Sequence, residues 1–213
     1  MKDKINHLID FIHRKIDSIF YFATIYPIYK IRFREIGYKT RIMSPLLITP
    51  SFIRIKNKVS VRNGARIEGV SVYLTKTYSP DILIEDNVTI EQNSHITCAN
   101  KITISKNTAI AANVTITDID HPYIDINTPP EKQELNVGFV FIGEDCKIYN
   151  NSVILPNAQI GKHTIIAANS VVLGKIYPAY CVLAGIPARI IKRYSFETNS
   201  WKKTDSQGNF LEV

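Results

Sequence analysis

The chain has few cysteines and no long apolar run, and these two absences argue against several classes of protein. Its 213 residues include three cysteines without a C-x-x-C pair, so neither a metal nor a redox motif is indicated. No window approaches the ~20 apolar residues of a spanning helix, and the N-terminal stretch lacks the small-residue cleavage site of a signal peptide. Free thiols fit a reducing compartment, so we expect a cytoplasmic protein, with the inner face of the membrane as the alternative.

Runs of basic residues are also absent, although the formal net charge is +7 and the pI is about 9.2. No stretch of four or more lysines or arginines occurs, and there is no helix-turn-helix or zinc-finger spacing, which argues against a nucleic-acid partner. The scattered charge better suits a phosphorylated cofactor, an acidic glycan or membrane headgroups.

What the chain does have is an aliphatic residue at every sixth position. The clearest run is Ile142, Ile148, Ile154, Ile160, Ile166 and Val172. An earlier run is Ile84, Ile90, Ile96 and Ile102, followed after a shift of two residues by Ile104, Ile110 and Ile116, and a weaker one is Ile55, Val61 and Ile67. Neither a helix nor a plain strand needs this period, so it predicts an all-β parallel β-helix whose coils stack inward-facing side chains.

A second, smaller residue belongs to the same interior. Small or β-branched side chains stand two positions before many of the repeat residues, namely Val88, Val114, Ser152, Ala158 and Thr164, and Cys146 takes one such place. Two inward residues on each short strand would fill a tapering core of this kind.

Residues 1–38 depart from the repeat and form a predicted helical arm. Apolar residues at helical spacing indicate an amphipathic helix from residue 3 to about 24, with its end near Pro27. We expect the apolar face to pack on the β-helix or on a sister subunit, and peripheral membrane association through residues 1–34 is the alternative.

Residues 39–192 form the predicted β-helical domain. A polar excursion loop, residues 118–139, interrupts it, and long insertions of this kind are often functional. A polar tail, residues 193–213, contains the only tryptophan, Trp201, and is expected to cap the open end of the β-helix.

Several motifs over about residues 80–193 resemble the hexapeptide-repeat acyltransferases. They are T-D-I-D-H-P, then I-G-E-D-C-K-I-Y-N-N-S-V-I-L-P-N-A-Q-I-G, A-A-N-S-V-V and A-G-I-P-A-R-I-I-K. The similarity is strongest to the branch that O-acetylates galactosides, maltose and capsule polysaccharides. The resemblance implies a left-handed β-helix, a homotrimer with active sites between neighbouring prisms, and acetyl-CoA as co-substrate without a metal.

His121 stands directly before Pro122 and matches the catalytic histidine of that family. Its chemistry fits independently, because an alcohol that attacks a thioester must lose its proton and an imidazole with a pKa of ~6.5 is a base near neutral pH. Asp118 or Asp120 would orient the ring, and the sequence does not choose between them. No serine or cysteine lies in a nucleophile motif, so we expect direct transfer within a ternary complex.

The resemblance also implies a cofactor channel. It places Asn150 and Ala168 along the pantetheine arm of acetyl-CoA, and Arg189 and Lys192 at the nucleotide phosphates, which basic side chains bind well. Asn93 matches a family position near the acyl group, more weakly. Read without the resemblance, the first pair are turn residues and the second pair are solvated charges.

Lys147 occupies the place where several relatives have a tryptophan, and the I-G that follows in them is Ile148-Tyr149 here. We therefore expect Lys147 and Tyr149 to alter the wall that meets the acceptor. The added positive charge would favour an acidic acceptor.

Together these observations predict an acetyl-CoA-dependent O-acetyltransferase. Its acceptor would be a hydroxyl of a cell-surface glycan, either an acidic capsule of the sialic-acid type or a lipopolysaccharide O-antigen saccharide. The alternatives are acetyl transfer to a small molecule such as an amino sugar, serine or a xenobiotic, and a non-catalytic scaffold. A zinc carbonic anhydrase on the same scaffold is disfavoured, because no two of the five histidines lie close together within the repeats.

Overall fold

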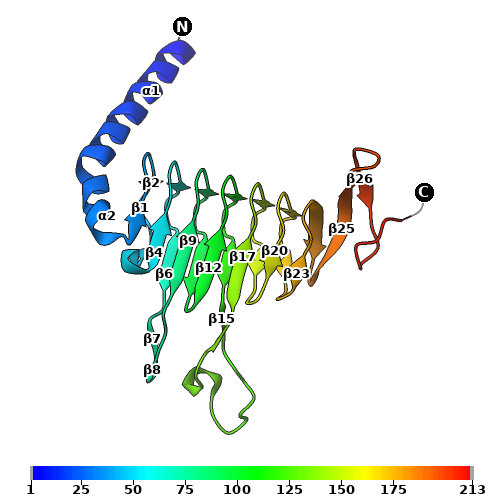
Figure 1. Ribbon diagram of the computed structural model, residues 1–213. Helices are drawn as coiled ribbons and strands as arrows, with labels where there is room; N and C mark the ends of the chain where they lie inside the picture. The colour runs from blue at the N-terminus through cyan, green and yellow to red at the C-terminus, as the bar shows by residue number, and fades with distance from the viewer. Residues whose placement is uncertain (1, 212–213) are drawn as a thin grey trace.

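The computed structural model describes residues 2–211, which form a rod of stacked three-sided coils with a helical arm at one end (Figure 1). Three parallel sheets run along the rod, an arrangement typical of a left-handed β-helix. Sheet A contains β1 (Glu35–Ile36), β4 (Ile53–Ile55), β9 (Asp81–Ile84), β12 (Lys101–Ile104), β17 (Phe139–Ile142), β20 (Gln159–Ile160) and β23 (Ile176–Tyr177).

The other two long sheets complete each coil. Sheet B contains β2 (Arg41–Ile42), β5 (Ser60–Val61), β10 (Thr89–Ile90), β13 (Ala109–Ile110), β18 (Lys147–Ile148), β21 (Ile165–Ile166) and β24 (Cys181–Gly185), then the antiparallel β25 (Ala188–Ser195) and β26 (Ser200–Lys203). Sheet C contains β3 (Leu47–Ile48), β6 (Arg66–Gly69), β11 (His95–Cys98), β14 (Thr115–Thr117), β19 (Val153–Ile154) and β22 (Val171–Val172). In each coil the polypeptide therefore passes through sheets A, B and C in turn.

The aliphatic repeat fills the interior of the rod, as the sequence predicts. The repeat isoleucines from Ile55 to Ile166 are fully buried, and so are the small residues two positions earlier, such as Ala158 and Thr164. Parallel pairing places Ile148 between Ile110 of one coil and Ile166 of the next. Because each coil contacts only its neighbours, stability is distributed along the rod.

The corners of the coils depend on residues in the left-handed backbone region, and asparagine is the most frequent residue type among them. Asn113, Asn151 and Asn169 have φ angles of 58°, 60° and 56° and stack at the corner between sheets B and C. Asn113 Nδ2 donates to Asn151 Oδ1 (3.2 Å), and Asn151 Nδ2 donates to Asn169 Oδ1 (3.0 Å). Asparagine tolerates this conformation better than most side chains, so it makes the turn and also links one coil to the next.

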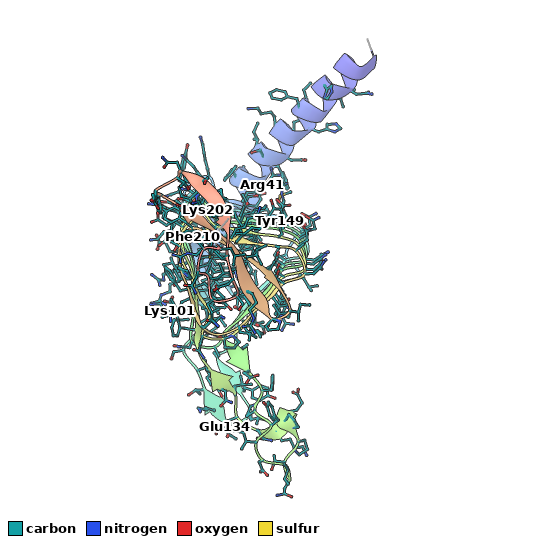
Figure 2. All side chains as sticks on the ribbon, turned by 90° about the vertical axis from the view of Figure 1, so that its right-hand side faces the viewer. Arg41, Lys101, Glu134, Tyr149, Lys202 and Phe210 are labelled. Carbon is teal, nitrogen blue, oxygen red and sulfur yellow. The ribbon has the colours of Figure 1, made fainter. Side chains whose placement is uncertain are left out.

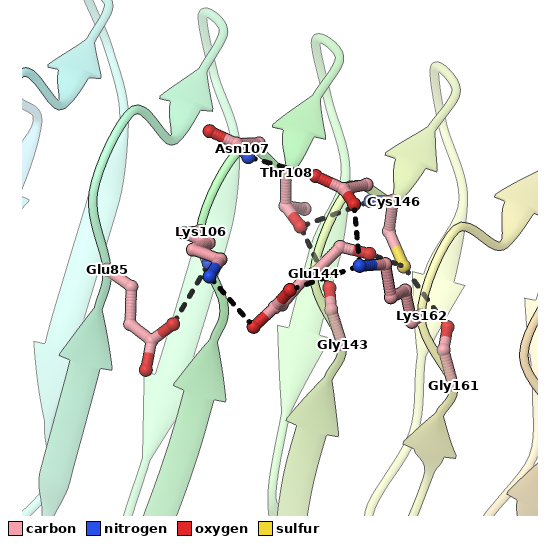
Figure 3. Close-up of polar contacts among 10 residues, drawn as sticks. Glu85, Lys106, Asn107, Thr108, Gly143, Glu144, Cys146, Gly161 and Lys162 are labelled. Atoms are coloured by element: carbon pink, nitrogen blue, oxygen red, sulfur yellow. Dashed lines mark hydrogen bonds and ion pairs between the residues drawn. The ribbon is translucent and has the colours of Figure 1, made fainter.

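The corner between sheets A and B has a comparable polar ladder (Figure 3). Asn107 Nδ2 donates to Asp145 Oδ1 (2.9 Å), and Glu144 pairs with Lys106 (3.2 Å) and Lys162 (3.4 Å) of the coils on either side. The hydrogen bond from Asn107 lowers the pKa of Asp145. These pairs are partly solvated, so each contributes little energy and the ladder mainly fixes the register.

The N-terminal arm is helical for longer than the sequence predicts. α1 (Lys2–Phe20) continues through a π-helical turn (Tyr21–Ile25) into α2 (Tyr26–Arg32), so the prediction that the helix ends near Pro27 is wrong. Pro27 lies in the first turn of α2, where a helix does not need the N–H that proline lacks.

The arm is attached to the rod by the π-helical turn and α2. Tyr21 is buried, and its hydroxyl accepts a hydrogen bond from the backbone N–H of Ile42 (2.9 Å). Burial raises the pKa of Tyr21 to about 12. Tyr26 Oη donates to the carbonyl of Gly37 (3.0 Å). These contacts fix the C-terminal part of the arm on the first coil.

α1 itself projects away from the coils (Figure 1). Ile12, Ile16 and Ile19, which share one face of the helix, are 45%, 57% and 69% exposed. This apolar face therefore does not pack on the β-helix of its own chain. Within residues 2–211, no helix combines the length and the apolar character needed to cross a membrane.

Two segments leave the coils on the same side of the rod (Figure 1). One is the predicted loop, now residues 118–138, whose stem is the antiparallel pair β15 (Ile119–Asp120) and β16 (Asn136–Val137) and which contains a 3₁₀ turn (Pro130–Lys132). The other is a hairpin of β7 (Val72–Tyr73) and β8 (Lys76–Thr77), which the sequence analysis did not predict.

The loop and the hairpin contact each other. Tyr73 Oη donates to the backbone carbonyl of Glu131 (2.8 Å), and Lys76 pairs with Glu134 (3.1 Å). Figure 2, seen from the C-terminal end of the rod, shows the loop with Glu134 projecting from the coils on the side opposite α1. The two insertions therefore brace one another outside the rod.

The C-terminal segment continues sheet B instead of forming a separate unit. β25 folds back on β24 and runs across residue 192, where the sequence analysis places the end of the β-helical domain. β26 then pairs with β25, with Tyr194 opposite Trp201. A further 3₁₀ turn (Pro50–Phe52) lies at the other end of the rod, before β4.

Two replacements of Asn151 test its role at the corner. Asn151→Gly keeps the left-handed backbone and loses the amide bonds, whereas Asn151→Ala must also hold alanine in a conformation that costs roughly 1–2 kcal/mol. The unfolded-state flexibility of glycine offsets part of this difference. In urea denaturation we expect Asn151→Ala to lower the free energy of unfolding by about 1 kcal/mol more than Asn151→Gly. Equal losses would contradict the argument.

Candidate functional site

His121 lines a pocket of ≈ 290 Å³ on the outer face of sheet C. The pocket lies between the two insertions, because the hairpin supplies Tyr73 and the loop supplies Leu135. β6 and β11 supply most of its polar side chains, which are Arg66, Glu68, His95 and Thr97.

The parallel register explains why these side chains meet. His95 pairs with Arg66 of the preceding coil, and Thr97 pairs with Glu68 on one side and Thr117 on the other. Alternate residues of a strand point to opposite faces, and the isoleucines between these positions fill the core. The polar residues therefore stand in two rows on the outer face, about 4.8 Å apart from coil to coil.

Tyr73 packs against the ring of His121. The two rings meet edge to face, with centroids 5.4 Å apart and an interplanar angle of 77°. The Tyr73 hydroxyl is fixed by its bond to Glu131, and lost hydration together with that contact raises the pKa of Tyr73. His121 itself is exposed, so an incoming hydroxyl can reach this residue.

The carboxylate of Asp118 binds backbone N–H groups and, in the part of the chain that the structure describes, makes no hydrogen bond to His121. It is fully buried, and its carboxylate accepts hydrogen bonds from the backbone N–H groups of residues 99–101 (2.8, 2.9 and 2.7 Å). It therefore fixes the turn between β11 and β12. Asp120 lines a separate cavity of ≈ 450 Å³, and Ile119 borders both cavities. Among residues 2–211, no hydrogen bond joins either carboxylate to His121.

His95 lies in the pocket with one ring nitrogen, Nε2, buried and without a hydrogen-bond partner. Burial lowers the pKa of His95, and the positive charge of Arg66 lowers it further, against a smaller opposing effect of Glu68. His95 is therefore a neutral imidazole at neutral pH.

The three cysteines are buried free thiols. Burial raises the pKa of Cys98 and of Cys181 above the ordinary value and that of Cys146 to about 11. A nucleophilic cysteine needs a lowered pKa and access to substrate. These thiols have neither, so they act as compact apolar side chains of the core.

The residues predicted to hold the cofactor lie along one edge of the rod. Asn150 and Ala168 occupy successive turns between sheets B and C, and the backbone N–H of Asn169 donates to the carbonyl of Asn150 (3.0 Å). Arg189 follows the next turn of that edge, and Lys192 lies further along the same strand, β25; both are exposed.

The residues predicted to meet the acceptor lie away from His121 in a single chain. Asn93 makes a turn between sheets B and C with a φ of 56°, whereas His121 follows the opposite end of sheet C. Lys147 belongs to β18 of sheet B and Tyr149 follows that strand directly, with Lys147 Nζ 5.4 Å from the centroid of the Tyr149 ring. None of the three lines the pocket that contains His121.

Sequence reasoning missed four residues of this pocket, namely Arg66, Glu68, Tyr73 and His95. One signal was present: each polar strand residue stands beside a repeat isoleucine, at a position that must face outward. The unrecognised hairpin between β6 and β9 concealed which of these positions pair with each other.

Known proteins of related sequence give a consistent picture. Residues 139–174 match the bacterial transferase hexapeptide (six repeats) family. The chain is 34% identical over 181 residues to WbbJ of Escherichia coli (strain K12), provisionally described as a lipopolysaccharide biosynthesis O-acetyl transferase; the match covers 76% of this chain and 92% of WbbJ. It is also 32% identical over 117 residues to the galactoside O-acetyltransferase of the same organism, covering 54% and 56%.

Solved structures share the fold. The hexapeptide-repeat acetyltransferase VCA0836 of Vibrio cholerae, complexed with acetyl coenzyme A, has a TM-score of 0.57 at 22% identity and covers 81% of this chain and 78% of its own. A galactoside acetyltransferase in complex with coenzyme A has a TM-score of 0.55 at 22% identity, covering 88% and 76%. Both have the architecture of this rod.

The lowered pKa of His95 predicts a loss of stability in mild acid. As the pH falls through ~6.5, the ordinary histidine value, the unfolded chain gains a proton at this site before the folded chain does, so the free energy of unfolding decreases. The carboxylates with lowered pKa, such as Asp145, change the free energy of unfolding with pH only below about pH 4.

The measurement compares wild type with His95→Gln. Between pH 7.5 and 5.5 we expect the Tm of wild type to fall further than the Tm of the variant, because glutamine does not titrate. An equal fall in both proteins would show that His95 is not the responsible group.

Proposed function

The chain belongs to the hexapeptide-repeat acetyltransferases and is an acetyl-CoA-dependent O-acetyltransferase, and we propose that its acceptor is a hydroxyl of a cell-surface saccharide. The observation that supports this most strongly is the exposed imidazole of His121 in a pocket of ≈ 290 Å³ that charged and hydroxyl-bearing side chains help to line. Similarity to WbbJ over 92% of that protein supports a lipopolysaccharide saccharide as the first candidate.

In the proposed reaction His121 acts as a general base. It accepts the proton of the acceptor hydroxyl while the hydroxyl oxygen attacks the thioester carbonyl carbon. The C–S bond then breaks, the departing sulfur takes a proton from His121, and the acetyl group remains on the acceptor as an ester. The buried, protonated cysteines favour this direct transfer over an acyl-enzyme intermediate.

We assign acetyl-CoA to the edge of the rod that contains Asn150 and Ala168. Backbone amides of the turns would hold the pantetheine arm, and Arg189 and Lys192 would meet the phosphates. In a single chain sheet C separates this edge from His121. A homotrimer in which the edge of one copy meets the loop of the next would bring base and thioester together.

Two classes of saccharide follow from the sequence, and the observations support them unequally. The similarity to WbbJ favours a lipopolysaccharide saccharide. An acidic capsule glycan of the sialic-acid type was inferred from the net charge and from Lys147. Lys147 does not line the pocket of His121, so it could favour an acidic acceptor only across an interface between copies.

The arm suits an enzyme that works beside a membrane. Residues 1–34 contain seven basic and three acidic residues and so contribute +4 of the net charge of +7. α1 adds the exposed apolar face of Ile12, Ile16 and Ile19. We propose that this arm binds anionic bilayers peripherally, where lipid-linked saccharides are presented.

Replacement of His121 tests the proposed function. His121→Ala should reduce turnover by about 10²- to 10⁴-fold, because the attacking hydroxyl loses its base. The assay follows thiol release from acetyl-CoA with saccharides, serine and amino sugars as acceptors. His163→Asn is the control, since His163 is exposed in a left-handed turn that asparagine also tolerates.

The outcomes are separable. Equal turnover of His121→Ala and wild type would remove the base from the mechanism. Transfer only to small molecules would remove the saccharide acceptor, and an absence of transfer to any acceptor by wild type would favour the scaffold.

Charged replacements on α1 test the membrane proposal. The triple variant Ile12→Asp, Ile16→Asp and Ile19→Asp should weaken binding to phosphatidylglycerol vesicles at least about tenfold, since it removes the apolar face that would enter the bilayer. The control adds the same three charges to the polar face, as Asn6→Asp, His7→Asp and Ser18→Asp. Dissociation of the oligomer by the first variant in sedimentation, with vesicle binding unchanged, would identify α1 as an interface between copies and would contradict membrane binding.

A further inference from the structure

The pocket beside His121 has two side chains of permanent charge, and they neutralise each other. Arg66 donates through both Nε and Nη2 to Glu68 Oε2, with Nε at 2.7 Å. His95 is neutral because of its lowered pKa, and the raised pKa of Tyr73 keeps its hydroxyl protonated. The pocket is therefore close to electrically neutral, although the whole chain has a net charge of +7.

The rim of the pocket adds negative charge. The carboxylate of Glu131, from the loop, lies 3.1 Å from Tyr73 Oη, directly beside the ring that packs on His121. Among the described residues, no lysine and no second arginine lines this pocket. An anionic group that approached His121 would thus meet two carboxylates and one guanidinium that is already paired.

The ion pair leaves atoms that suit sugar hydroxyls. Both bonds from Arg66 end on Oε2 of Glu68, so Oε1 of Glu68 and Nη1 of Arg66 are available to other partners. A hydroxyl can donate to Oε1 while its neighbour on the sugar ring accepts from Nη1. The side chain of Glu68 is only 20% exposed and that of Arg66 39%, so the pair is held in place from one side and open towards the pocket.

A row of hydroxyls continues from the ion pair. Thr97 is the register partner of Glu68 in the next coil, and Thr97 Oγ1 donates to Thr117 Oγ1 (3.1 Å) of the coil after that. All these groups are uncharged and can both donate and accept. The two threonine hydroxyls lie on sheet C between the ion pair and the base of the loop that contains His121.

We propose that this pocket selects a neutral saccharide as acceptor and that Glu68 is the residue that enforces the selection. The inference rests on the proposed function, because it takes the pocket as the place where the acceptor meets His121. A sugar hydroxyl donates a charge-assisted hydrogen bond to the carboxylate of Glu68, whereas a sugar carboxylate or phosphate is repelled by that carboxylate. Glu68 acts on binding and not on proton transfer.

A purely structural role for the ion pair makes a different prediction. Partly exposed pairs contribute little to stability, and a tie within one strand would affect all acceptors alike. Selection by charge instead changes the ratio between a neutral acceptor and an anionic acceptor of the same shape. A galacturonamide and the corresponding galacturonide form such a pair, because they have the same ring hydroxyls and differ only at C6, where one has a carboxamide and the other a carboxylate.

The experiment compares the ratio of kcat/KM for these two acceptors in wild type, Glu68→Gln and Glu35→Gln. Glutamine keeps the shape of Glu68 and removes its charge. Glu35→Gln is the matched control, since Glu35 pairs with Lys56 (2.7 Å) on sheet A, away from the pocket. We expect wild type and the control to prefer the galacturonamide, and Glu68→Gln to shift the ratio towards the galacturonide by about tenfold or more, with the KM for acetyl-CoA unchanged.

The results that would overturn the inference are distinct from failure of the proposed function. A wild-type enzyme that prefers the galacturonide, or a Glu68→Gln variant with an unaltered ratio and unaltered folding, would overturn selection by Glu68 while leaving O-acetylation intact. Absence of transfer to any saccharide by wild type would instead defeat the proposed function, and this inference with it.

Discussion

The structure depends on the stacking of one isoleucine upon the next along the axis of the rod. Each coil must return its chain to the same three interior positions, so every strand has a fixed register and every outward residue a fixed row. The short strands hold only two to four residues each in the regular coils, and they gain stability from neighbours above and below and not from their own length. The packing of the interior therefore also determines where functional side chains lie on the outer faces.

The same constraint explains how much of the fold the sequence predicts. Ile148 is buried between Ile110 and Ile166. A core of this geometry accepts few other residues, so an aliphatic residue must recur at every sixth position and the repeat is visible in the sequence. The loop at residues 118–138 could also be predicted, because the period stops there. The hairpin β7–β8 could not: it is short, and the irregular coils beside it already weaken the period. Pro27 misled for another reason, since proline is as acceptable at the start of a helix as after its end.

The site was less predictable than the fold. His121 is marked by its place at the start of the loop, and the resemblance of the surrounding motif adds to this. Arg66, Glu68 and His95 have no local motif, because they become neighbours only when parallel strands pair across an insertion of unknown length. Asn93 shows the converse: the resemblance to the family selects it, but a single chain places it at the other end of sheet C from the histidine.

The hairpin and the loop enter the rod between complete coils and return to it in register. Either insertion can therefore change in length or composition during evolution while the stacked interior stays as it is. Tyr73 and Glu131 are the points at which the two insertions hold each other, so a lineage that altered one would need a compensating change in the other. Acceptor preference in this fold would then change when the hairpin and the loop change together, while the coils stay the same.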